Sequence, residues 1–87
     1  MLLDWDPRKR LSNLAKHSVD FASAEFFEWD VAVVYASLGA AEPRLVAYAP
    51  IASRLHALVF SIETRTVRVI GLRKANRREI KRYEAEA

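Results

Sequence analysis

The chain has 87 residues, of which 52% are hydrophobic and 29% charged, with two glycines and three prolines. This length supports one hydrophobic core and the composition excludes a disordered chain, so we expect a single domain over residues 1–87. The absence of cysteine excludes a disulfide scaffold, and the net charge of +3 conceals a basic block at residues 65–82, which holds eight basic residues and one acid for a local charge of +7.

The first half of the chain predicts a short strand followed by two helices. Asp6 is suited to cap the first helix, and Leu11 and Leu14 have the spacing of its inward stripe. Asp20 is the next cap signal, and apolar residues at helical spacing follow it. The expected elements are a strand at residues 2–5 and helices at residues 7–16 and 21–29.

From residue 31 onward, β-branched and aromatic residues predict four consecutive strands, at residues 31–37, 44–49, 55–63 and 66–72. Their short connections favour antiparallel pairing. A capping box of Asn76 and Glu79 begins a last helix. We therefore predict an α+β fold of order β-α-α-β-β-β-β-α, in which two N-terminal helices and one C-terminal helix pack on an antiparallel sheet of four to five strands.

The basic block has two interpretations, a solvated face or an anion-binding site. Arg77 and Arg78 occupy the first turn of the last helix, where the helix dipole disfavours cations by roughly 0.3–1 kcal/mol each. A bound phosphate would relieve that cost, because helix amides and nearby cations both attract anions. We therefore favour anion binding.

Strand parity gives a further expectation for the basic block. Arg68 shares the parity of Ile70 and Leu72, which predicts that its guanidinium points toward the more buried side of the sheet or its rim. Arg73 lies five residues further on, so the two arginines face opposite sides of a regular strand. They can converge only if the strand is irregular, and Gly71 is a suitable place for a bulge.

His17 and Tyr83 each have a structural and a functional interpretation. A histidine at a helix C-terminus is commonly structural, which we favour from spacing alone, although an imidazole with an ordinary pKa of about 6.5 also suits proton transfer. Tyr83 either packs beside Ile80 or stacks on a base. His56 is expected to be structural. No cluster of histidine and acids has ligand spacing, so we expect neither a metal nor a cofactor.

No apolar run approaches the roughly 20 residues of a membrane span, so we expect no membrane segment. The N-terminus has Asp4 and Asp6 where a signal peptide would be basic and then apolar. We therefore expect a cytoplasmic location.

Three stretches together resemble the BrnT toxins. Residues 5–7 (WDP) and 13–21 (NLAKHSVDF) are similar to the family's WDP and N-x-x-KHG-V-x-F opening, with Ser18 at the usual glycine. Glu42, Pro43 and Arg44 match an E-x-R element. Residues 67–79 (VRVIGLRKANRRE), followed by Tyr83, resemble the closing R-x-I-x-x-R-K-A-x-x-x-E pattern. The resemblance covers nearly the whole chain in the same order, as a single BrnT-like toxin domain.

The resemblance implies a RelE-like ribonuclease toxin that cuts RNA without a metal, inhibits translation and arrests growth. It also implies a BrnA-like ribbon-helix-helix antitoxin whose complex with the toxin binds operator DNA. In the implied reaction a ribose 2′-hydroxyl attacks the adjacent phosphate, and cations stabilise the developing charge. The implied catalytic residues are Arg44, Arg68, Arg73 and Lys74, with Lys74 or His17 as proton shuttle, and the implied RNA-binding residues are Arg77, Arg78 and Tyr83.

Two other classes of function stay open. The basic block can serve a non-catalytic module that binds an acidic antitoxin surface or the phosphates of operator DNA. It can also be the solvated face of a scaffold protein, which the cations at the helix start disfavour.

Overall fold

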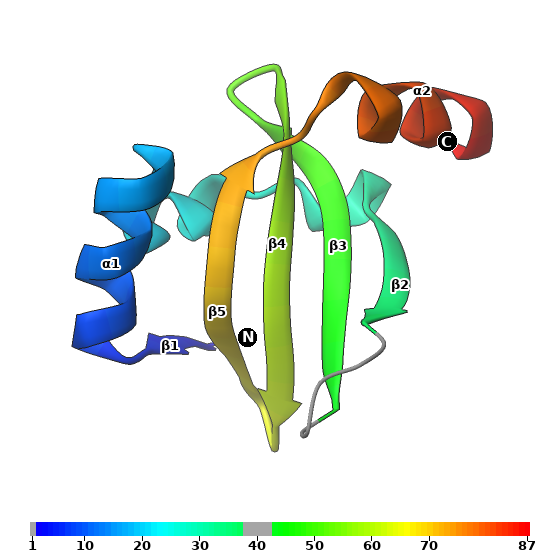
Figure 1. Ribbon diagram of the computed structural model, residues 1–87. Helices are drawn as coiled ribbons and strands as arrows, with labels where there is room; N and C mark the ends of the chain where they lie inside the picture. Colours follow the sequence, from blue (N-terminus) through cyan, green and yellow to red (C-terminus); the bar gives the residue numbers. More distant parts are fainter. Residues whose placement is uncertain (1, 38–42) are drawn as a thin grey trace.

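The computed structural model describes residues 2–37 and 43–87, which form a five-stranded sheet of order β1-β5-β4-β3-β2 with helical segments around it (Figure 1). The elements are β1 (Leu2–Trp5), α1 (Pro7–His17), the 3₁₀ segments η1 (Phe21–Phe26) and η2 (Trp29–Val31), β2 (Val33–Ser37), β3 (Arg44–Ile51), β4 (Arg54–Glu63), β5 (Thr66–Lys74) and α2 (Arg77–Glu86). None of the helices in these two ranges is long and apolar enough to span a membrane.

The strand and cap predictions are largely confirmed, but the sheet is mixed. β2 to β5 form antiparallel neighbours, whereas β1 pairs in parallel with β5, with Leu2 opposite Thr66 and Trp5 opposite Val69. The prediction of an antiparallel sheet was wrong at this edge. Parallel pairing needs a long crossover, and the whole chain between β1 and β5 supplies it.

The expected second helix, residues 21–29, is replaced by η1 and η2. Phe21, Ala24 and Phe27 are buried at a spacing of three residues, which matches the 3.0-residue turn of a 3₁₀ helix better than the α-helical period. Asp20 still caps the segment and accepts a hydrogen bond from the Ala22 amide at 3.0 Å. The Trp29 ring then packs edge-on against Phe27 and Phe60, which holds η2 on the sheet.

The sheet separates two apolar clusters. Behind it in Figure 1, η1 and η2 cover the larger one, whose fully buried members are Phe21, Leu58, Leu72, Val67 and Val69. On the opposite face, α2 covers a smaller cluster at the upper end of the sheet, formed by Tyr48, Leu55, Ala57 and Ala75. No helix of residues 2–37 and 43–87 lies over the lower part of either face in Figure 1.

α1 lies at the edge of the sheet beside β5, and a polar residue attaches it there. Leu11 and Leu14 are exposed, so the predicted inward stripe is wrong, and Asn13 is the buried residue of the helix. Its Nδ2 donates to the Leu72 carbonyl at 2.7 Å and to the Val19 carbonyl at 3.0 Å, and its Oδ1 accepts from the Leu72 amide at 3.2 Å. β1 pairs with β5 only as far as Val69, so at Leu72 no strand lies beside this edge of β5. The Asn13 side-chain amide pairs with the Leu72 peptide there, as a neighbouring strand would.

A bulge in β5 changes the parity of its side chains. Val59 lies opposite Gly71 and Phe60 opposite Val69, which leaves Ile70 as the extra residue. The bulge predicted at Gly71 is therefore confirmed, and Arg68 and Arg73 share one face. That face is opposite to the buried Val69 and Leu72, so the expectation that Arg68 points toward the more buried side was wrong.

Asn13→Leu tests the attachment of α1. The substitution keeps the volume but leaves the amide and carbonyl of Leu72 unpaired in a buried place, so we expect a loss of roughly 2–4 kcal/mol in the free energy of unfolding. Urea unfolding at pH 7 measures it. Ser12→Ala, at the exposed neighbouring position, is the control and should change stability by less than about 0.5 kcal/mol. Equal stability of Asn13→Leu and the wild type would contradict this account.

Candidate active site

An open groove of about 430 Å³ lies between α1 and the α2-bearing face of the sheet. Its lining comes from α1 (Lys9, Ser12, Asn13, Lys16 and His17), β3 (Arg44), β4 (Val59) and the β5 bulge (Ile70 and Gly71). Three of these side chains are cationic and none is acidic. The groove is therefore a positively charged concavity, the kind of surface that attracts phosphates.

The α1 side of the groove follows from helical spacing. Lys9, Ser12 and Lys16 recur at intervals of three and four residues, so they share one helix face with Asn13. Because Asn13 fixes that face against β5, the two lysines are directed along the groove. Lys9, Ser12 and Lys16 were not among the predicted site residues, because apolar periodicity assigned the inward face of the helix to the leucines. The helical spacing of these three polar residues was the signal that could have identified them.

His17 is the last residue of α1 and lines the groove in a half-buried position. The chain turns immediately after it, because Ser18 has φ of 59° and donates its amide to the Leu14 carbonyl at 2.9 Å. A left-handed residue is strained unless it is glycine, the usual residue here in the BrnT pattern. The turn ends the helix at His17 and leaves its imidazole at the mouth of the groove.

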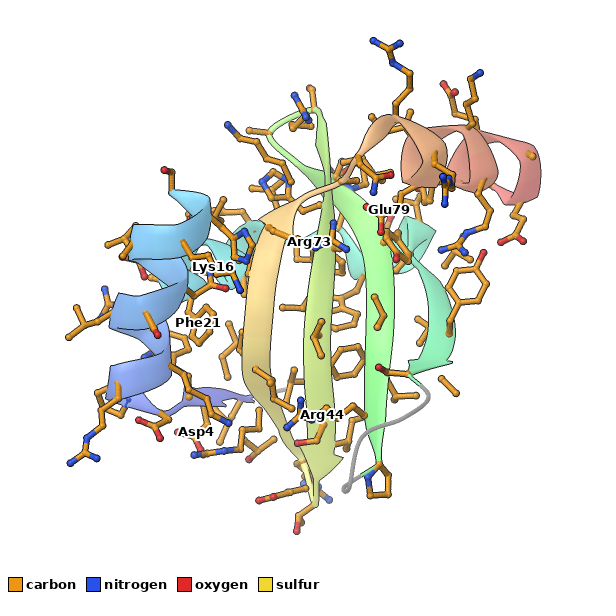
Figure 2. The ribbon with its side chains drawn as sticks, in the orientation of Figure 1. Asp4, Lys16, Phe21, Arg44, Arg73 and Glu79 are labelled. Carbon is orange, nitrogen blue, oxygen red and sulfur yellow. The ribbon has the colours of Figure 1, made fainter. Side chains whose placement is uncertain are left out.

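Arg44 lies on the same face of the sheet as the groove and lines it from β3, across from α1. It begins β3, opposite Ser37 of β2, and Figure 2 shows it near the lower end of the sheet, while Lys16 lies beside β5. Its Nε is buried without a hydrogen-bond partner among residues 2–37 and 43–87. An unpaired buried N–H costs about 1–3 kcal/mol, so a bound anion that accepts from this atom would be favoured.

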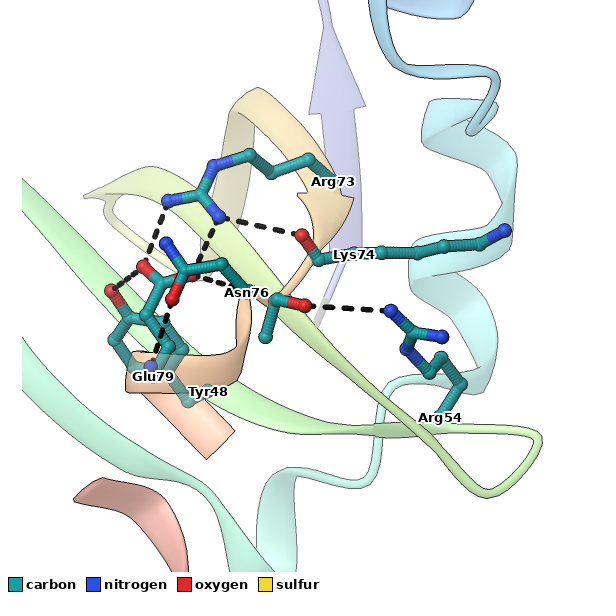
Figure 3. A network of polar contacts seen from close by, with 7 residues as sticks. Tyr48, Arg54, Arg73, Lys74, Asn76 and Glu79 are labelled. Atoms are coloured by element: carbon teal, nitrogen blue, oxygen red, sulfur yellow. Dashed lines mark hydrogen bonds and ion pairs between the residues drawn. The ribbon is translucent and has the colours of Figure 1, made fainter. Parts of the chain in front are cut away.

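Arg73 lies on the same face, two residues beyond Gly71, within a compact polar network (Figure 3). Its guanidinium makes two hydrogen bonds with the Glu79 carboxylate, at 2.7 and 2.9 Å, and the Tyr48 hydroxyl donates to the same carboxylate at 2.9 Å. The Arg73 guanidinium is the main cause that lowers the pKa of Glu79 to about 2. Burial, and then Glu79, raises the pKa of Tyr48. The positive charge of Arg73 is thus paired with a carboxylate.

Arg68 is also paired. Its Nη1 donates to Oδ2 of Asp4, and the two residues lie opposite each other in β5 and β1. Both side chains are partly exposed. Arg68 therefore sits at the edge of the face that contains the groove, with its charge balanced in the free protein.

Lys74 is on the opposite face. Its side chain extends away from the Arg73 network in Figure 3, and Lys74 is paired with His56 in the register of β4 and β5. Burial, which favours the neutral ring, is the principal cause that lowers the pKa of His56, and the charges of Arg54 and Lys74 lower it further. His56 Nδ1 lies 2.7 Å from the Arg54 carbonyl, so the structural role predicted for it is confirmed.

The remaining predicted RNA-binding residues belong to α2. Arg77 and Arg78 are exposed in its first turn, where the capping box is present: Glu79 accepts from the Asn76 amide and Asn76 accepts from the Glu79 amide, both at 2.9 Å. Tyr83 packs against the smaller cluster and donates its hydroxyl to the Val31 carbonyl at 2.7 Å. That contact lies at the β2 edge, away from α1. The structure thus places His17 and Arg44 in the lining of one groove, and the lining does not include these three residues.

Within the described ranges, no three side chains of the metal-binding types (His, Cys, Asp, Glu) gather in one place. The polar groups that the groove offers are amines, a guanidinium, an imidazole and a hydroxyl. These groups bind and protonate oxyanions, which fits a phosphodiester ligand.

Comparisons with known proteins show the family of this chain. A family model described as ribonuclease toxin BrnT of type II toxin–antitoxin systems matches residues 5–79. The chain belongs to the BrnT family. A crystal structure of the Brucella abortus ribonuclease toxin BrnT is 32% identical and superimposes with a TM-score of 0.68, covering 88% of this chain and 100% of that one. A search of curated proteins gave no significant match.

Membership in the BrnT family confirms the resemblance drawn from the sequence motifs. The matched residues 5–79 begin at the Trp5 motif and end at Glu79, and they include α1, strands β2 to β5 and every residue that lines the groove. A type II system also implies an antitoxin partner for this chain. The α+β architecture is shared with the Brucella toxin over nearly its entire length.

The network around Glu79 generates a pH prediction for this BrnT protein. The folded pKa of about 2 lies below the ordinary value of 4.5, so the pair with Arg73 stabilises the fold above pH 4.5 and is lost as the pH falls toward 2. Glu79→Gln keeps the capping-box shape, and we expect it to reduce stability at pH 7 by roughly 1–3 kcal/mol and to flatten the decline below pH 4.5. Chemical denaturation from pH 7 to pH 3 measures both effects.

Glu84→Gln is the matched control, because it removes the same charge from an exposed position of α2. It should leave both the stability at pH 7 and its acid dependence close to those of the wild type. An unchanged acid dependence in Glu79→Gln would show that the carboxylate does not carry this stability.

Proposed function

We propose that the protein is an endoribonuclease toxin that cleaves RNA without a metal ion, using the groove between α1 and β5. One observation supports this most strongly: the groove combines an imidazole, His17, with the cations Lys9, Lys16 and Arg44. RNA contains its own nucleophile, the ribose 2′-hydroxyl, so the protein has only to move protons and stabilise charge.

Each groove residue has a role in this proposal. Arg44 and Lys16 bind the phosphate from opposite sides and stabilise the charge on its oxygens, the guanidinium through its unpaired Nε–H. His17 transfers the proton, as base for the 2′-hydroxyl or as acid for the leaving 5′-oxygen. We prefer His17 to Lys74 as the shuttle, because the Lys74 side chain lies on the other face of the sheet.

Arg73 and Arg68 extend the site along the same face. In the free protein each is held by a carboxylate, Glu79 or Asp4. A neighbouring RNA phosphate competes with these acids for the guanidinium groups, so both arginines contribute to binding of a longer strand. Arg77, Arg78 and Tyr83 then serve as more distant contacts to the same RNA.

We extend the proposal to the cellular context of the protein. We place the fold in the RelE-like superfamily and the protein in the cytoplasm, where cleavage of RNA inhibits translation and arrests growth. The antitoxin is a BrnA-like ribbon-helix-helix protein, and the complex of toxin and antitoxin represses its own promoter at operator DNA.

Cleavage of a labelled RNA by the purified protein in EDTA tests this function. We expect activity in EDTA, a loss of roughly 10²–10⁴-fold in His17→Ala and a loss of roughly 10²–10³-fold in Arg44→Ala. Lys74→Ala is the matched control, since it removes a cation from the opposite face, and should retain activity within about threefold.

Three results would contradict the proposal. Loss of cleavage in EDTA would indicate a metal-dependent reaction. An equal loss of RNA cleavage in Lys74→Ala and His17→Ala would show that the groove is not the site of the reaction. Tight RNA binding without cleavage would favour the alternative function, a non-catalytic basic module that acts as antitoxin partner and co-repressor.

A further inference from the structure

A second groove, of about 590 Å³, lies on the opposite face of the sheet from the basic groove. Its walls are almost entirely apolar and include Leu3, Trp29, Val34, Phe60 and Ile62. These residues come from β1, η2, β2 and β4, and η1 borders the groove through Ala24 and Glu25. It is therefore the part of the larger apolar cluster that η1 and η2 leave uncovered.

The apolar groove exposes large side chains to solvent. Val34 is 48% exposed, Ile62 53% and Trp29 39%. Single exposed apolar residues are common on protein surfaces, but a continuous apolar concavity usually marks a site where another molecule binds. Burial of these side chains by a partner would stabilise the complex by the ordinary hydrophobic effect.

The segment that borders this groove has the opposite charge to the protein as a whole. Residues 20–30 contain Asp20, Glu25, Glu28 and Asp30 and no basic residue, whereas the whole chain has a net charge of +3. Asp20 is paired with Arg10 at 2.8 Å. The other three acids make no ion pair with the described residues, and Glu25 lines the groove itself. The groove thus has an apolar lining with one acidic residue, Glu25, which belongs to an acidic segment of the chain.

We propose that this groove is the docking surface for the antitoxin, and that it takes an amphipathic antitoxin segment whose apolar side chains are flanked by lysine or arginine. The choice of occupant depends on charge: the Glu25 carboxylate in an apolar lining, within an acidic segment, favours an apolar segment that carries basic residues. That the partner is an antitoxin rests on the toxin assignment of the preceding subsections. RNA is disfavoured as the occupant, because the acids repel phosphates.

The position of the apolar groove has a consequence for inhibition. The basic groove faces the other side of the sheet, so a segment bound here does not itself cover His17 or Arg44. The antitoxin is anchored on one face, and any part of it that blocks RNA must reach around the sheet edge or extend from another segment. Docking and catalysis can therefore be separated by mutation.

The experiment measures the affinity of the purified toxin for the antitoxin encoded beside its gene, by calorimetry at fixed ionic strength. Val34→Lys and Ile62→Lys place a charge among exposed groove residues and should each weaken binding roughly tenfold or more. Glu25→Lys should weaken it as well, in a salt-dependent manner. Thermal melting and RNA cleavage by each free variant should match the wild type, which shows that the fold and the basic groove are intact.

Two control variants repeat these changes elsewhere. Leu11→Lys alters an apolar residue on α1 that is 68% exposed, and Glu84→Lys reverses a charge on α2; both should bind the antitoxin as the wild type does. Wild-type affinity in Val34→Lys and Ile62→Lys would overturn the proposal, and so would a loss of binding confined to Leu11→Lys. A dimer of the toxin alone that Ile62→Lys dissociates would instead make a second copy the occupant.

The result is separable from the ribonuclease assignment. If the free wild-type protein fails to cleave RNA while the groove variants still lose the antitoxin, the assigned chemistry is wrong and the docking surface stands. If cleavage is observed and the groove variants bind normally, the docking surface is wrong and the ribonuclease stands.

Discussion

The pairing of the Asn13 side chain with the Leu72 peptide determines how this molecule is arranged. β1 leaves the sheet after Trp5, and the next peptide groups of β5 would face the gap without partners. Asn13 supplies both a donor and an acceptor there, at 2.7 and 3.2 Å, so a helix takes over from a strand along one edge. This attachment sets the rotation of α1, directs its lysines and His17 toward the bulge, and leaves Leu11 in solvent. The basic groove exists because of this one contact.

The two faces of the sheet have different surface chemistry. On the face of the basic groove, the arginines of β5 are held by carboxylates, while Lys9, Lys16 and Arg44 line the concavity without an acid. On the other face, the apolar groove is lined by Glu25, which belongs to a segment, residues 20–30, with four acids and no basic residue. A modest net charge of +3 therefore results from strong local charges of opposite sign. Phosphate binding and protein docking can occupy different surfaces of a very small domain, because a single sheet is accessible from both sides.

Local signals in the sequence were sufficient for much of the fold. Asp6, Asp20 and the Asn76 capping box marked the starts of helical segments, and β-branched runs located four strands. The incorrect predictions concern features that depend on contacts between residues distant in the sequence. The partner of β1 lies more than sixty residues away, which no local pattern encodes. The burial of Asn13 was not predicted, because apolar periodicity assigns the inward face of a helix to leucines, whereas an unpaired strand edge requires a polar group. The three-residue spacing of Phe21, Ala24 and Phe27 was informative, but it was read as α-helical.

For the site, the basic block drew attention to residues 65–82, whereas the groove is formed mainly by α1 and Arg44. The central claim is that RNA phosphates bind between α1 and the β5 bulge. A titration of the ¹⁵N-labelled protein with an RNA methylated at its 2′-hydroxyls, which cannot be cleaved, tests it most directly. The account predicts that the largest amide shifts occur at Lys16, His17 and Gly71. Shifts confined to Arg77 and Arg78 at the start of α2 would contradict it and would return the anion site to the basic block.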